Sequence, residues 1–145
     1  MIFKRECHYV KNSITLFFFN GTCREALQFY SEILEGTIKG VMTYGEANEK
    51  VADDPERVIH SQLEVDGQLF MLSDIPKDDN SMLQDRNVYI VLEFDSEEAL
   101  TRAYNQLKAD GEVQMALDDM FWGAKYAKLI DKYDIGWDLS YTKPS

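Results

Sequence analysis

The amino-acid sequence predicts an α+β fold in which two βαβββ units follow one another in tandem. Its 145 residues are 45% hydrophobic, which suffices for the core of a single domain, 1–145. One order of patterns, an apolar strand, an amphipathic helix and three strands, occurs twice, over 13–74 and 87–142. Five residues also recur 73 positions later, and an internal repeat of this length outweighs any single local pattern. The recurring pairs are Thr22 and Asp95, Glu25 and Glu98, Ala26 and Ala99, Leu27 and Leu100, and Leu34 and Leu107.

The first unit opens with a strand and a helix. Residues 13–19 are rich in β-branched and aromatic side chains and end at an Asn-Gly pair, which predicts a buried strand followed by a turn. Thr22 and Glu25 have the spacing of a capping box, in which the Thr22 hydroxyl accepts from the Glu25 backbone N–H. A helix is therefore expected over 22–35, and Gly36 is expected to end it in the left-handed conformation.

Three strands complete the first unit. They are expected over 37–44, 57–65 and 68–73, with a polar loop over 45–56. The Asp66-Gly67 pair between the last two strands is a strong hairpin signal. Side chains alternate along 57–65, so one face of this strand carries His60, Gln62 and Glu64, and the other Ile59, Ser61, Leu63 and Val65.

The second unit repeats this order after a loop over 74–86. Residues 87–94 form an apolar strand, and Asp95 to Glu98 is a second capping signature. A helical stripe from Leu100 to Leu107 follows, and the helix ends at Gly111. The three closing strands are expected over 113–117, 121–130 and 136–142.

Charge and composition exclude several classes of partner. Fifteen Lys and Arg against 26 Asp and Glu give a net charge of −11, which repels nucleic-acid phosphates and anionic lipids. Apolar runs such as residues 16–19 are far shorter than the ~20 residues that span a bilayer. The first residues lack a secretory signal, and Cys7 and Cys23 form no CxxC motif. We therefore expect a cytoplasmic protein with free thiols and without nucleic-acid or membrane partners.

Each unit has a sheet of which the helix covers only one face. The other face stays partly apolar, and burying it against the second unit or a second subunit forms a curved sheet around a cleft. Apolar cleft edges of this kind predict a homodimer. We expect the function to reside in the cleft.

Several segments resemble a known family. They are residues 14–30, residues 42–45, residues 60–63 with 72–74, residues 121–123 and residues 131–137. Together they resemble the PhnB-like branch of the vicinal-oxygen-chelate superfamily, which includes glyoxalase I, extradiol dioxygenases, and bleomycin- and fosfomycin-resistance proteins. The resemblance runs from about residue 13 to the end of the sequence. It implies paired βαβββ units, usually in a homodimer.

The resemblance also implies where catalytic members hold a divalent metal. They use four side chains, typically His and Glu, one from each central strand. The corresponding positions in this sequence are Thr15, a residue near Leu72, Tyr89 and Asp138. Only Asp138 is an ordinary metal ligand, whereas divalent ions require several carboxylate or imidazole donors. We therefore expect no metal-ligand set and no cofactor.

Two side chains are candidates for catalysis in the cleft. His60 lies on the polar face of its strand and can act as a general base near neutral pH. The alternative is an edge-strand histidine that faces solvent or bonds to a loop. Asp138 is expected on the cleft face because its two apolar neighbours face the helix. The alternative for Asp138 is an ion pair with a lysine such as Lys125 or Lys128.

Further residues are candidates for binding a ligand. They are Phe17, Phe19, Phe70, Leu72, Tyr89 and Trp122 as an apolar wall, with Gln62 as a polar contact. The alternative for most of the aromatic residues is the hydrophobic core. Trp122 differs, because Gly123 beside it permits a bulge that re-aims the indole.

These patterns predict a small-molecule-binding protein of unknown substrate that works without a metal, as resistance members of the family sequester compounds. The alternative is a metal-dependent enzyme of the glyoxalase, dioxygenase or resistance type, in which His60 and Asp138 act on a small oxygenated substrate. The small number of carboxylates and imidazoles expected in the cleft favours binding.

Overall fold

The computed structural model describes residues 13–83 and 88–144 and shows the same element order twice. The first module comprises β1 (Thr15–Phe19), α1 (Cys23–Ile33), β2 (Thr37–Thr43), β3 (Val58–Val65) and β4 (Gln68–Asp74). The second comprises β5 (Ile90–Glu93), α2 (Glu97–Leu107), β6 (Glu112–Asp119), β7 (Ala124–Ile130) and β8 (Gly136–Thr142). A 3₁₀ helix, Asn80–Leu83, follows the first module. The predicted tandem of βαβββ units is confirmed.

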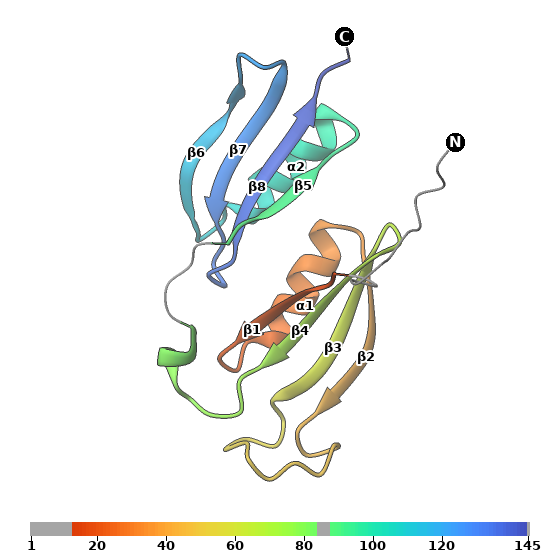
Figure 1. Cartoon of the computed structure of the whole chain (residues 1–145), viewed down its shortest axis with the longest axis vertical. Helices are drawn as coiled ribbons and strands as arrows, with labels where there is room; N and C mark the ends of the chain where they lie inside the picture. Colours follow the sequence, from red (N-terminus) through yellow and green to blue (C-terminus); the bar gives the residue numbers. More distant parts are fainter. Residues whose placement is uncertain (1–12, 84–87, 145) are drawn as a thin grey trace, which may run out of the picture.

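Each module is a four-stranded mixed sheet with one helix packed on one face (Figure 1). The strand orders are β1-β4-β3-β2 and β5-β8-β7-β6. In both sheets the first strand pairs in parallel with the last, and the remaining pairs are antiparallel. The face opposite the helix, called the outer face below, has no helix of residues 13–83 and 88–144 on it. It is therefore the face on which a site can be built.

Most predicted strand bounds agree with the structure, but the strand expected over 87–94 is Ile90–Glu93, with residue 87 outside the described residues, and the strand expected over 121–130 begins three residues late. Met120 to Gly123 form the turn of the β6–β7 hairpin, closed by a bond from the Gly123 N–H to the Met120 carbonyl oxygen of 3.1 Å. Gly123 has a φ of 86°, which favours glycine. Phe121 and Trp122 therefore lie at an exposed hairpin tip, where the predicted bulge is a turn instead.

Gly36 follows the first helix, but it is not the left-handed residue that the sequence predicts. The left-handed residue is Glu35, with a φ of 53°, and not Gly36. A Cβ on Gly36 would lie 2.9 Å from both Leu63 and Val65 side-chain atoms. The second module has the same arrangement, since Asp110 has a φ of 57° and a Cβ on Gly111 would lie 2.4 Å from the Ile130 carbonyl oxygen. These glycines permit close packing of the chain against the sheet.

The predicted capping box at α1 is absent. Thr22 is the N-cap residue, but its side chain makes no capping hydrogen bond. The buried carboxylate of Asp74, at the end of β4, instead accepts from the backbone N–H groups of Gly21 (2.9 Å) and Cys23 (3.0 Å). In α2 the cap is Ser96, one residue later than expected, and its hydroxyl accepts from the Ala99 N–H at 3.1 Å. A distant residue therefore caps the first helix, whereas a local one caps the second.

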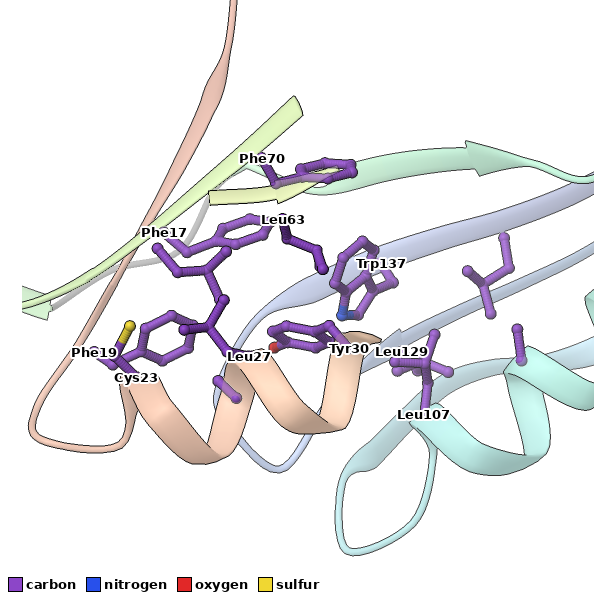
Figure 2. Close-up of a cluster of buried hydrophobic side chains, with 14 of the residues drawn as sticks. Phe17, Phe19, Cys23, Leu27, Tyr30, Leu63, Phe70, Leu107, Leu129 and Trp137 are labelled. Carbon is purple, nitrogen blue, oxygen red and sulfur yellow. The ribbon is translucent and has the colours of Figure 1, made fainter. Parts of the chain in front are cut away.

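A single hydrophobic core runs through both modules (Figure 2). The Phe17 ring from β1 stacks on Phe70 at 5.9 Å between centroids and meets Trp137 of the second module edge-on at the same distance. Tyr30 of α1 also contacts Trp137, at 5.5 Å. Figure 2 shows these rings between the strands and the helices. The helix-facing sides of the two sheets thus share one hydrophobic core.

A buried carboxylate stands at the junction of the modules. Asp131, in the turn between β7 and β8, accepts from the Tyr30 hydroxyl (2.6 Å) and the Trp137 indole N–H (2.7 Å). It also accepts from the backbone N–H groups of Tyr133 (2.8 Å) and Ile135 (3.1 Å). Desolvation raises the pKa of Asp131 and also that of Tyr30. This group links α1 to the second module.

The structure also bears on the sequence predictions about thiols and membranes. Cys23 is a free, buried thiol, and burial raises its pKa to about 12, so it is not a reactive nucleophile at neutral pH. Cys7 lies outside the described residues. In residues 13–83 and 88–144, no helix is long and apolar enough to cross a membrane.

Candidate functional site

The outer face of the first sheet carries both apolar and polar side chains. It carries Leu16, Phe18, Met42, His60, Gln62 and Met71, which the sheet register brings together. Leu16 and Phe18 are 44% and 48% exposed, whereas Phe17 and Phe19 between and beside them are buried. Leu16 lies opposite Met71, and Met71 lies opposite Gln62. His60 lies opposite Met42, and Gln62 follows it on the same face of β3, so the predicted base has an apolar and a polar neighbour there.

The outer face of the second sheet carries a polar group of side chains. Trp137 and Leu139 are buried in the core, and Asp138 between them therefore points to the outer face, as the alternation predicts. Lys128 on β7 is the direct cross-strand partner of Asp138. We call the group formed by Tyr89, Gln114, Tyr126, Lys128 and Asp138 the Asp138 cluster.

Hydrogen bonds and a cation–π contact connect the Asp138 cluster. The Tyr126 hydroxyl donates to Asp138 Oδ2 at 2.5 Å, and Lys128 Nζ lies 3.6 Å from Asp138 Oδ1. The same ammonium lies 4.1 Å above the centroid of the Tyr89 ring. The Tyr89 hydroxyl donates in turn to Gln114 Oε1 at 2.6 Å. The cluster thus extends across the whole width of the second sheet, from Tyr89, just before β5, to Gln114 on β6.

Two features of the cluster matter for its chemistry. Burial, followed by the hydrogen bond to Asp138, raises the pKa of Tyr126 to about 12, so this hydroxyl stays protonated and remains a donor at neutral pH. Asp138 Oδ1 is inaccessible to solvent and accepts no hydrogen bond from the described part of the chain. A buried carboxylate oxygen without a hydrogen-bond donor is costly, and the Lys128 ammonium 3.6 Å away offsets part of this cost.

The two candidate catalytic residues lie on different sheets. His60 is on β3 of the first sheet and Asp138 on β8 of the second. No hydrogen bond or ion pair joins them within residues 13–83 and 88–144, so one chain does not assemble the predicted acid–base pair. Of the lysines considered as partners, Lys128 faces Asp138, and Lys125 pairs with Glu97 at 2.6 Å.

The predicted apolar wall divides into core residues and outer-face residues. Phe17, Phe19, Phe70 and Leu72 belong to the hydrophobic core on the helix side of the first sheet. Phe17 also lines a pocket of about 190 Å³ between the modules, and Phe19 lines another of about 730 Å³. Tyr89 belongs to the Asp138 cluster, and the Trp122 ring lies 6.1 Å from that of Tyr126. Only Tyr89 and Trp122 of this set adjoin the polar cluster.

The metal positions implied by the family resemblance do not converge on one point. Leu72 is fully buried in the core, and Thr15 pairs in register with core residue Phe70, so both lie on the helix side of the sheet. Asp138 is on the outer face, next to an ammonium group that competes with any metal cation. Among the described residues, no three His, Cys, Asp or Glu side chains gather as a ligand set. The residues present do not fit a divalent metal ion.

Sequence reasoning missed two members of the cluster. Alternation along 124–130, with Ala127 and Leu129 buried, places Tyr126 and Lys128 on the face of Asp138, so this signal was available for Tyr126. Gln114 had no such signal. The β6–β7 register is interrupted between Val113 and Met115, so the position of Gln114 depends on the three-dimensional pairing.

The tandem βαβββ fold is that of the glyoxalase superfamily, and comparison with known proteins agrees. The family model of the Glyoxalase/Bleomycin resistance protein/Dioxygenase superfamily matches residues 12–139. The chain belongs to this superfamily.

Individual relatives cover nearly the whole chain. Protein YjdN of Escherichia coli (strain K12) is 23% identical in an alignment of 136 positions that covers 86% of this chain and 91% of that protein. Protein PA1353 from Pseudomonas aeruginosa has a solved structure with a TM-score of 0.81 and 28% identity, covering 93% of this chain and 100% of that one. A putative 3-demethylubiquinone-9 3-methyltransferase, PhnB protein, from Bacillus cereus has a TM-score of 0.75 at 24% identity, covering 91% and 100%. The last similarity supports the fold alone.

Proposed function

We propose that this chain binds a small organic molecule on the outer face of its second sheet, at the Asp138 cluster, without a metal ion. The observation that carries the proposal is the Lys128–Asp138 pair, held between two tyrosines on a sheet face that no helix in the described part of the chain covers. A small set of placed polar groups beside aromatic rings is typical of ligand sites. Trp122 and Tyr89 supply the aromatic surface and Tyr126 a fixed donor.

Tryptophan fluorescence can test this proposal. Trp122 is 53% exposed beside Tyr126, whereas Trp137 is buried in the core, so a ligand at the cluster changes the emission of Trp122. In a small-molecule screen by thermal shift and fluorescence, we expect hits whose affinity falls about tenfold in Asp138→Asn, since the carboxylate that holds the Lys128 ammonium and the Tyr126 hydroxyl in place is lost. Lys125→Met is the matched control, because Lys125 is on the same strand but pairs with Glu97.

Two results would count against the proposal. Hits whose affinity is the same in the wild type and in Asp138→Asn would place the binding site elsewhere. One equivalent of divalent metal that survives dialysis and is lost in Asp138→Ala would contradict metal-independent binding and favour the metal-dependent enzyme.

We further propose that the protein works as a homodimer in which a second copy covers the outer face of the first sheet. Leu16, Phe18 and Met42 are each more than 40% exposed on this face, and exposed apolar side chains of this size on one face commonly mark an interface. His60 and Gln62 share the face, so the same contact would enclose them. Sedimentation at micromolar concentration should show a dimer that Phe18→Asp weakens, and a monomer independent of concentration would contradict this.

A further inference from the structure

The two charged groups of the Asp138 cluster lie at different depths below the surface. Lys128 and Asp138 face each other across β7 and β8, with Nζ and Oδ1 3.6 Å apart. The Lys128 side chain is 31% exposed and that of Asp138 19%, and Asp138 Oδ1 is inaccessible to solvent. A molecule that approaches the outer face therefore meets the ammonium group first and the carboxylate behind it.

The neighbours of the pair keep the ammonium in this place. The Tyr89 ring lies on one side of Lys128 Nζ, and its hydroxyl is tied to Gln114. Tyr126 holds the carboxylate by its other oxygen, Oδ2. Lys128 donates no hydrogen bond within residues 13–83 and 88–144, so its N–H groups remain for an acceptor on the ligand.

We infer that the Lys128–Asp138 pair makes this site select uncharged ligands that carry a hydrogen-bond acceptor, such as a carboxamide, ketone or ester, on a flat apolar body. The inference rests on the proposed binding function of the cluster. A cationic ligand meets the ammonium group first and is repelled. An anionic ligand bound to Lys128 lies close to the Asp138 carboxylate and in the field of a chain with a net charge of −11. A neutral acceptor gains the hydrogen bond without either repulsion.

The rings beside the pair suit a flat ligand body. Trp122 lies edge-on to Tyr126 with 6.1 Å between ring centroids, and half of its surface is open. An aromatic or conjugated ligand can contact this ring while its acceptor reaches Lys128. The test therefore uses probes with one phenyl ring and a planar head group of the same size that is neutral, anionic or cationic.

The probes are benzamide, benzoate and benzamidinium, titrated against the whole protein at neutral pH and low salt, with binding followed by amide NMR shifts in β7 and β8. The wild type should prefer the neutral benzamide over both ions by about fivefold, the ratio that corresponds to one partly exposed ion pair. Lys128→Met leaves the carboxylate alone and should shift the preference to benzamidinium. Asp138→Asn leaves the ammonium alone and should shift it to benzoate.

The control and the contrary outcomes separate this inference from the proposed function. Lys125→Met also removes one positive charge from β7 and should keep the preference for benzamide. An unchanged order of probes in both Lys128→Met and Asp138→Asn, a wild-type preference for either ion, or no wild-type binding of benzamide would overturn the inference. In each of these cases, hits from the small-molecule screen that depend on Asp138 would leave the proposed function standing.

Discussion

Replacement of Asp131 by alanine is expected to lower the free energy of unfolding by roughly 3 to 5 kcal/mol. The Asp131 carboxylate accepts four hydrogen bonds at the module junction, from Tyr30, Trp137 and two backbone N–H groups of its own turn. Removing it leaves these donors unpaired in a region where Asp131 is itself 3% exposed. Urea denaturation of the wild type and of Asp131→Ala measures the difference.

Tyr30→Phe is the matched control for this prediction. It deletes one donor to Asp131 and keeps the ring that packs on Trp137, so a loss of only about 1 kcal/mol is expected. If Asp131→Ala cost no more than Tyr30→Phe, the carboxylate would not be the centre of the junction.

The same residue should give the protein a characteristic pH dependence. Desolvation holds the pKa of Asp131 above its ordinary value of about 3.9, so the folded chain binds this proton more tightly than the unfolded chain. The contribution of protonated Asp131 to stability is then fully present below about pH 4 and is lost as the pH rises through the raised folded pKa. The stability of the wild type relative to Asp131→Asn, measured from about pH 4 upward, should therefore fall. A relative stability that rises over this range would show that the pKa is lowered instead.

Replacement of Asp74 by alanine is the second change with a large expected effect, roughly 3 kcal/mol of destabilisation. Asp74 is 2% exposed and accepts from the backbone N–H groups of Gly21, Cys23 and Val58. One carboxylate thus caps α1 and ties it to the start of β3 and the end of β4. Besides the shift in urea denaturation, faster hydrogen exchange is expected at the three amides, because each loses its acceptor.

Thr22→Ala distinguishes this cap from the one that the sequence predicts. A Thr22 hydroxyl that capped the helix would be worth about 1 kcal/mol, but in the structure it makes no such bond, so the substitution should change stability little. Ser96→Ala in the equivalent place of α2 should cost about 1 kcal/mol, because Ser96 does cap its helix. Equal losses in the two variants would contradict the role of Asp74.

Hydrophobic periodicity by itself determined the order of the elements and the face on which most side chains lie. The strand over 136–142 has the predicted bounds, and the Asp66-Gly67 turn has the two positive φ values, 48° and 78°, that such a hairpin needs. Alternation also placed Asp138 opposite the core. These properties depend on residues only a few positions apart, so the sequence alone is enough to predict them.

Only the tertiary structure decided which residues meet across long separations. Asp74 caps a helix 51 residues earlier, and Asp131 accepts from a tyrosine 101 residues earlier, and no local pattern marks either carboxylate. The same holds for the candidate site. Periodicity set His60 and Asp138 each on the outer face of its own sheet, but the register of β7 and β8 decided that Lys128, and not Lys125, lies beside Asp138. The spacing of residues along the chain determines on which face of a strand a side chain lies. Its neighbours on other strands are determined by strand register and module packing, which depend on the whole core.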